Sequence, residues 1–328
     1  SGDSKVAGFT AQNLFRDLAI ELLEAVERSH AHQIPVGAAE RLARKRALRE
    51  QADSIGPDRP FEQFRAILET CLERIQPRRM LLMLDEFDKV QEAIDNEVLS
   101  PQVPENLRFL FHTYDSVSAI LTGSRRIKRL REEYWSVLFG IGKRIGVTKL
   151  DSQSARQLVT RPVAGRLVYA ESALEGVLFL TSCQPYLLQY LASEVFQLCA
   201  ERGQRSVTTA TVDEAAEQMV HDFEHFQSLF RDQLGTERRR YLLCLINRLA
   251  EGPDRVTSEL LNVELEHKGI RYRSFSALKS DLEELRELEA IAIDDGAYRL
   301  EVPLLSLWLK QNVDCASHLE GARYEEES

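Results

Sequence analysis

The chain lacks the long apolar runs of a membrane protein. No stretch approaches the roughly 18 consecutive apolar residues of a transmembrane helix, and no basic segment followed by an apolar one stands at the N-terminus, as it would in a secretory signal. The five cysteines are odd in number and scattered, without C-x-x-C spacing. We therefore expect buried free thiols, neither a disulfide framework nor a zinc site, and a cytoplasmic protein with no membrane partner.

The chain also has fewer positively than negatively charged residues. The 42 Lys and Arg residues face 52 Asp and Glu residues, which gives a net charge of −10. A protein of this charge repels nucleic acid and anionic membranes unless a local basic patch intervenes. The length of 328 residues, of which 44% are hydrophobic, allows two or three packed domains.

A phosphate-binding loop is missing as well. Such a loop reads G-x-x-x-x-G-K followed by Ser or Thr, because glycines let backbone N–H groups approach the phosphates and the hydroxyl holds Mg²⁺. The pair Gly142-Lys143 has Arg144 where the hydroxyl should be, and its first glycine is misplaced. We expect a loop here, followed by a strand at Ile145–Lys149.

The first part of the chain alternates between helical and strand patterns. Thr10 is the expected N-cap of a helix, a polar stretch over 30–58 is expected to be a surface helix or a mobile excursion, and a second amphipathic helix is indicated over 61–75. Two apolar runs, at 80–84 and 118–121, flank a helix around 107–111. This order predicts a doubly wound α/β fold whose parallel strands are buried on both faces.

Helical patterns dominate from Asp151 onward, and either Asp151 or Ser152 is the expected cap of the next helix. They are predicted over 152–160, 172–181, 185–199 and 212–230, and again from Glu237, over 258–265 and over 274–288. A hairpin with an Asp294-Asp295-Gly296 turn completes a winged helix-turn-helix pattern. The expected domains are an α/β core over 1–150, a helical lid over 151–235, a winged helix over 236–313 and a disordered acidic tail over 314–328.

Polar residues follow both apolar strands. Asp85 and Glu86 end the first, while Thr122, Ser124 and Arg125 end the second. Ligands bind at the carboxyl ends of parallel strands, where we expect Asp85 to hold Mg²⁺ and Glu86 to act as the base for an attacking water. Thr122 and Ser124 would touch that water or a terminal phosphate, and Arg125 would meet phosphate charge. The alternative is that the carboxylates only cap the next helix.

The pattern of an apolar strand with D-E-F-D, then A-I-L-T-G-S, resembles the Walker B and sensor 1 motifs of prokaryotic STAND-type AAA+ ATPases. Residues 163–169 and the segment L-T-S-C-Q-P-Y-L-L-Q at 180–189 resemble later motifs of that family, as does the end of the chain near Trp308. The resemblance spans about 9–312. It implies a P-loop NTPase-like core, ATP and Mg²⁺ as cofactors, Pro185 near the adenine, and oligomerisation.

Three functions fit this sequence. The first is an ATP-driven switch or assembly ATPase, recorded without its N-terminal part or lacking the phosphate-binding loop, so that the 328 residues bind nucleotide weakly. The second is a DNA-binding regulator, which we do not favour because 236–312 holds twelve basic against fourteen acidic residues and its expected recognition helix carries four acids. The third is an inert protein-interaction platform.

Overall fold

The computed structural model describes residues 10–31, 38–123, 142–143, 145–221 and 223–325. The chain divides into two compact units, Ser1–Ile145 and Gly146–Ser328. Of the helices in the described segments, none has both the length and the apolar character of a transmembrane segment.

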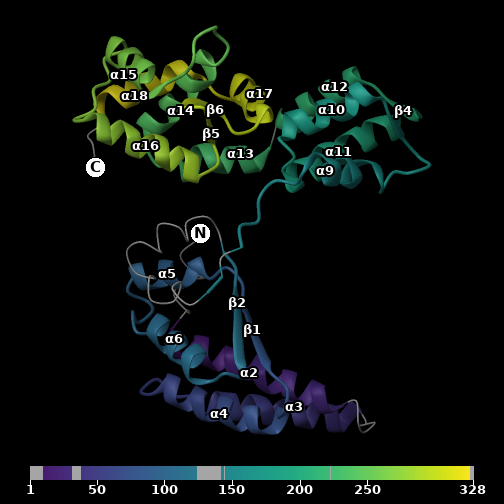
Figure 1. Ribbon diagram of the computed structural model, residues 1–328, viewed down its shortest axis with the longest axis vertical. Helices are drawn as coiled ribbons and strands as arrows, with labels where there is room; N and C mark the ends of the chain where they lie inside the picture. The colour runs from purple at the N-terminus through teal and green to yellow at the C-terminus, as the bar shows by residue number, and fades with distance from the viewer. Residues whose placement is uncertain (1–9, 32–37, 124–141, 144, 222, 326–328) are drawn as a thin grey trace. The chain divides into compact units, whose positions relative to one another are not determined.

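Three helices of the first unit pack together: α2 (Ala11–Ala31), α3 (Ala38–Asp53) and α4 (Pro60–Ile75) (Figure 1). The hydroxyl of Thr10 accepts a hydrogen bond from the backbone N–H of Asn13, as an N-cap does. The ring of Phe15 on α2 lies 5.5 Å from that of Phe64 on α4, and both side chains are fully buried. The amphipathic spacing of α2 and α4 thus produces the helical side of the core.

The two strands of this unit form a parallel pair. Strands β1 (Met80–Leu84) and β2 (Val117–Leu121) run in register from Met80↔Val117 to Leu84↔Leu121. Helices α5 (Asp88–Asp95) and α6 (Val103–Thr113) lie in the crossover between them. The helix, strand, helix, strand order predicted from the sequence is therefore present.

Within the described segments, one face of this sheet carries exposed apolar side chains. Met80 and Leu82 are each 9% exposed, whereas Leu81 is 53%, Met83 72% and Ile120 45% exposed. The prediction that both faces are buried is wrong for the described part of the chain.

The strand expected at Ile145–Lys149 is also wrong, since the described residues there have no strand conformation. Ile145 is 78% exposed and Val147 is 89% exposed. A strand needs a neighbour to satisfy its backbone groups, and none of the described residues pairs with this segment.

The second unit begins with a helical group held on a common apolar core. Asp151 caps the first helix, where its carboxylate accepts a hydrogen bond from the backbone N–H of Ser154 at 2.9 Å. The helices of this group are α9 (Ser152–Thr160), α10 (Glu171–Thr181), α11 (Pro185–Glu201) and α12 (Thr209–His221). Two short strands pair parallel in the loops between these helices: β3 (Val168–Tyr169) lies between α9 and α10, and β4 (Ser206–Val207) lies between α11 and α12.

The prediction of a single helix over 212–230 is wrong, because the helical conformation is interrupted within this range. After α12 come α13 (Glu224–Ser228) and a π-helical turn, η1 (Leu229–Gln233). Phe223 lies between α12 and α13 with extended backbone, and its side chain is only 3% exposed. The extended backbone at Phe223 interrupts the helix, and its ring is buried in the core.

Three helices, a hairpin and a further helix follow. They are α14 (Glu237–Leu249), α15 (Ser258–His267), α16 (Phe275–Glu287), β5 (Ile291–Asp294), β6 (Ala297–Leu300) and α17 (Pro303–Asn312). The strands pair antiparallel, and both turn residues, Asp295 and Gly296, have positive φ. That conformation is typical of a two-residue hairpin turn and confirms the turn predicted here.

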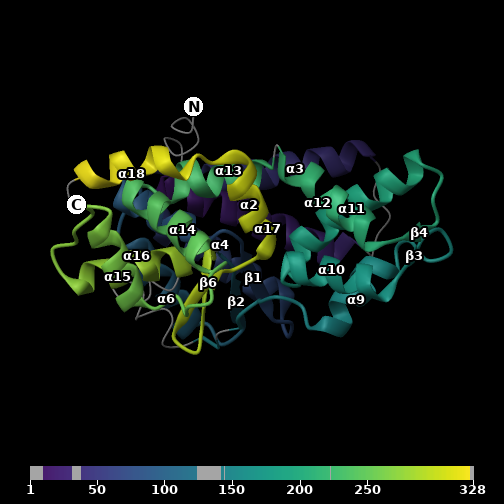
Figure 2. The same cartoon turned by 90° about the horizontal axis from the view of Figure 1, so that it is seen from above.

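The acidic tail expected to be disordered instead contains helix α18 (Cys315–Tyr324), which packs along α14 (Figures 1 and 2). Cys315 forms a disulfide with Cys244 of α14, so the expectation of five free thiols is wrong as well. Glu325 accepts hydrogen bonds from the backbone N–H groups of Glu237 and Arg238, at 3.1 and 2.8 Å. These bonds fall on the orphan donors that begin α14, and they fix the end of the chain there.

Candidate functional site

The carboxyl ends of β1 and β2 meet at one edge of the sheet. The register pairs Leu84 with Leu121, so Asp85 and Thr122 are the first residues beyond the sheet on each strand. The backbone N–H of Thr122 donates to the carbonyl of Leu84 at 2.9 Å. The structure therefore brings two of the predicted site residues together.

Asp85 is held by two hydrogen bonds on one carboxylate oxygen. Its Oδ1 accepts from the hydroxyl of Thr122 in a short hydrogen bond, and from the backbone N–H of Glu86 at 3.0 Å. The bond from Thr122, followed by that from Glu86, lowers the pKa of this exposed carboxyl below its ordinary value. Asp85 is thus an oriented carboxylate that stays ionised at neutral pH.

Glu86 has an unusual backbone. Its φ of 50° lies in the left-handed region, which a residue with a side chain seldom occupies. Phe87 follows with its side chain 4% exposed and donates its backbone N–H to the carbonyl of Thr122 at 2.8 Å. Burial of Phe87 and this hydrogen bond hold the turn, while Glu86 itself is exposed. Backbone strain of this kind costs on the order of 1–3 kcal/mol and clusters at functional sites.

The capping alternative fits the geometry less well. The N-cap of α5 is Phe87, whose own side chain makes no capping hydrogen bond. The Oδ1 of Asp85 accepts from Thr122 and Glu86 instead of the first N–H groups of α5. The carboxylate of Asp85 is therefore directed across the sheet edge toward β2.

Of the other predicted site residues, Ser124 and Arg125 are outside the described residues. Pro185 belongs to the second unit, where it is the first residue of α11 behind the N-cap Gln184. Ser182 and Cys183, in the same turn, both have positive φ. This turn belongs to the segment 180–189, which resembles a later motif of the ATPase family.

The donor set at the sheet edge fits a hard divalent cation. Mg²⁺ takes one or two carboxylates and completes its shell with water and substrate phosphates. Both hydrogen bonds to Asp85 end on Oδ1, which leaves Oδ2 to face a hydrated ion. No group of three or more His, Cys, Asp and Glu residues in the described segments is arranged to hold a metal. Asp85, with its free Oδ2, is therefore the described carboxylate at this edge that we expect to meet such an ion.

The link between Thr122 and Asp85 was not anticipated from the sequence, which directed the Thr122 hydroxyl at a water or a phosphate. The equal lengths of the two strands could have indicated this hydrogen bond. Two five-residue strands in register must end together, and this places the next side chain of each strand at the same edge.

The overall arrangement is that of the P-loop ATPases: an α/β core followed by a C-terminal helical region. The Walker-type ATPase of Pyrococcus abyssi superposes with a TM-score of 0.59 at 16% identity, over 92% of this chain and 79% of that one. The ORC2 protein of Aeropyrum pernix, solved as ADPNP–ADP complexes, gives a TM-score of 0.55 at 14% identity, over 92% and 82%. No family model and no curated protein matches the chain. Likeness at this level of identity establishes the fold alone.

Proposed function

We propose that this protein is an ATP-binding and ATP-hydrolysing molecular switch or assembly ATPase of the AAA+ class, of the STAND type. The observation that carries the proposal is the pairing of Asp85 with Thr122 beside Glu86, at the carboxyl edge of a parallel sheet. Two solved structures of similar fold are ATPase and nucleotide-bound proteins by name. Residues 151–235 would be the lid and 236–313 the winged helix of a cytoplasmic protein that oligomerises or binds a protein partner.

Each residue at the sheet edge has a distinct role in this proposal. Thr122 orients the carboxylate of Asp85, whose ionised Oδ2 holds the magnesium hydration shell. The cation would neutralise phosphate charge when bound. Glu86, on its left-handed turn, presents its carboxylate at the same edge to orient the attacking water and accept its proton.

The 328 residues contain no G-x-x-x-x-G-K-S/T loop, so ATP hydrolysis in this proposal requires phosphate contacts supplied by a further segment. The sheet face with exposed apolar side chains supports this part of the proposal. Leu81, Met83 and Ile120 expose apolar side chains there, and Ile145 and Val147 are exposed nearby in the sequence without strand pairing. One further strand and helix, bearing the loop, would bury such a surface.

The test is to extend the protein upstream in its source gene and measure Mg²⁺-dependent ATP hydrolysis beside a Glu86→Gln variant. The proposal expects a phosphate-binding loop in the added sequence, and a variant that binds ATP with turnover reduced by about 10²-fold or more. Asp88→Asn, at the start of α5, is the matched control and should hydrolyse ATP normally. If no loop exists and ATP does not bind, the inert interaction platform is the better account.

DNA binding is a second candidate, because the structure removes one objection to it. Asp281 of α16 is not displayed to solvent, since its carboxylate accepts from the Nε of Arg239 and the hydroxyl of Tyr272, both at 2.8 Å. Its side chain is only 16% exposed. Asp281 was one of the four acidic residues that argued against DNA binding by this helix, and its carboxylate is instead paired with residues of the same fold.

The N-terminal end of α16 is basic. Residues 269–280 contain Arg271, Arg273 and Lys279 but no Asp or Glu, and all three side chains are exposed. Recognition helices contact DNA through their N-terminal residues. If this surface binds DNA, an Arg271→Gln, Lys279→Gln double variant should weaken binding and flatten its salt dependence, whereas the exposed Arg205→Gln should not. Absence of salt-dependent binding by the unaltered protein eliminates this candidate.

A further inference from the structure

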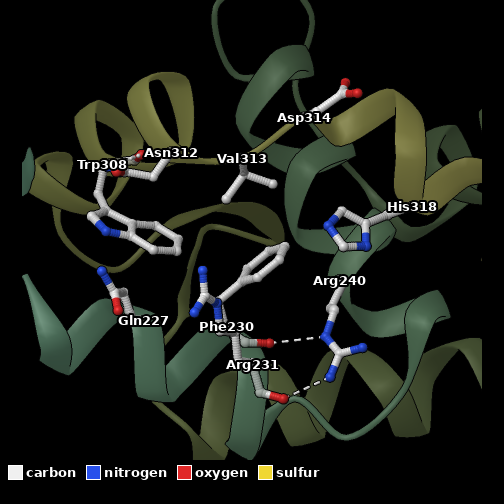
Figure 3. Close-up of a pocket in the computed structure, with 9 residues that line it drawn as sticks. All are labelled: Gln227, Phe230, Arg231, Arg240, Trp308, Asn312, Val313, Asp314 and His318. Carbon is white, nitrogen blue, oxygen red and sulfur yellow. Dashed lines mark hydrogen bonds between the residues drawn. The ribbon is translucent and has the colours of Figure 1, made fainter. Parts of the chain in front are cut away.

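A pocket of about 420 Å³ lies in the second unit, between η1, α14, α17 and α18 (Figure 3). Its volume lies within the range of small-molecule sites. It is lined by Gln227, Phe230, Arg231, Arg240, Trp308, Asn312, Val313, Asp314 and His318. None of these residues belongs to the sheet edge described above.

The π-helical turn shapes one wall of this pocket. The backbone N–H of Leu234 donates to the carbonyl of Leu229, a five-residue spacing. The carbonyls of Phe230 and Arg231 accept from Arg240, at 2.9 Å from Nε and 2.7 Å from Nη2 (Figure 3). A further nitrogen of Arg240 pairs with Glu237. Arg240 is therefore a structural residue with its charge neutralised. π-Helical turns are rare in proteins overall, and those that occur are often found at functional sites.

Arg231 differs from Arg240 in having no partner. Its guanidinium makes no hydrogen bond or ion pair with any described residue, although it lines the pocket. Asp314, the one carboxylate of the lining, already accepts from the backbone N–H of Ala316 at 3.0 Å. Asp314 keeps its negative charge, but Arg231 pairs with no described carboxylate and is therefore the cation of the lining that an anionic ligand group can meet.

Two further donors accompany Arg231. The indole Nε1 of Trp308 is buried without a hydrogen-bond partner, in a residue that is only 2% exposed. Figure 3 shows this nitrogen on the ring edge turned toward the side-chain amide of Gln227, which makes no hydrogen bond to a described residue. A buried unpaired N–H costs free energy, and an acceptor supplied by a ligand removes that cost.

The remaining lining is apolar and aromatic. The Phe230 ring lies 5.7 Å from that of Trp308 and 5.1 Å from that of His318, and Val313 lines the same pocket. His318 Nδ1 lies 2.6 Å from Glu237 Oε2, so this ring is held in place. A flat apolar body fits against these groups.

We propose that this pocket binds a small aromatic carboxylate. The carboxylate accepts hydrogen bonds from Arg231, Gln227 and the indole of Trp308, and the ring of the ligand lies against Phe230 and Val313. A planar guanidinium matches a carboxylate in a two-point arrangement. The residues of this site all belong to the second unit, whereas those of the sheet edge belong to the first, and binding at the pocket requires no nucleotide.

Benzoate is the probe, with benzamide as its uncharged analogue. The sequence has two tryptophans, Trp135 and Trp308, so a Trp135→Phe background leaves the pocket residue as the sole fluorophore. Titration should give a saturable change in Trp308 fluorescence with benzoate and a much weaker one with benzamide. Arg231→Gln should weaken benzoate binding by about tenfold or more.

Arg205→Gln removes an exposed arginine remote in sequence from the pocket lining and should leave binding unchanged. Thermal-shift measurements on the full chain with native tryptophans give a second readout that does not depend on the Trp135 substitution. Equal binding of benzoate and benzamide, unchanged affinity in Arg231→Gln, or no saturable response in either readout would overturn the proposal.

Discussion

Removal of the Cys244–Cys315 disulfide should strongly destabilise the second unit. The bond joins residues 71 positions apart. For a closed loop of that length, the chain-entropy relation gives a stabilisation of about 4 kcal/mol at room temperature. A Cys315→Ser variant should therefore lose about 4 kcal/mol of unfolding free energy in urea, and the unaltered protein should lose a similar amount in excess dithiothreitol.

Cys183→Ser is the matched control, because Cys183 is a free thiol of the same unit and its loss should leave the difference between oxidised and reduced protein unchanged. Thiol titration after denaturation gives an independent count. Oxidised protein should show three reactive thiols, from Cys71, Cys183 and Cys199, and reduced protein should show all five. Five thiols in the oxidised protein, or a Cys315→Ser variant as stable as that protein, would refute the reasoning.

Three further perturbations test other parts of the structure. Thr122→Val should raise the pKa of Asp85, because it removes the hydrogen bond that lowers that pKa most; NMR titration of the Asp85 carboxyl measures the change. Burial raises the pKa of Tyr169 from 10.0 to about 12, so the unfolded chain ionises first and stability should fall by about 1.4 kcal/mol per pH unit between these values. Tyr169→Phe should make the measured fall less steep by this amount in urea denaturation at successive pH values, because other tyrosines with raised pKa, such as Tyr272, still contribute to it. Glu325→Ala removes the acceptor for the first two N–H groups of α14 and should cost about 1 kcal/mol, whereas the exposed Glu320→Ala should cost less; equal losses would contradict the capping role.

The sequence predicted those elements whose side-chain spacing reports local structure. The spacing of Phe64, Leu68 and Cys71 predicted α4, and all three are fully buried. Thr10 was predicted as a helix cap and makes a capping hydrogen bond, and of the two candidate caps Asp151 and Ser152 it is Asp151 that makes one. Such features depend on residues only a few positions apart, which a single sequence displays directly.

Contacts between distant residues were not predictable in this way. Cys244 and Cys315 have no motif that pairs them, and α18 has Ala322 as its one fully buried residue. Its position depends mainly on contacts with residues far away in the sequence, among them the disulfide, the hydrogen bonds to Glu325 and the pairing of His318 with Glu237. The same limit applies to the bond between Thr122 and Asp85, which follows from strand register.

The parallel register of β1 and β2 also has a consequence for the order of folding. Every residue pair in this sheet joins positions 37 apart, whereas β5 and β6 pair across a two-residue turn. Contacts between distant positions form more slowly, because the intervening loop must close first. The hairpin should therefore gain protection from hydrogen exchange early during refolding, and the edge that carries Asp85 and Thr122 should be among the last parts to assemble. A chain caught before that step would have most of its helices but no organised carboxylate site.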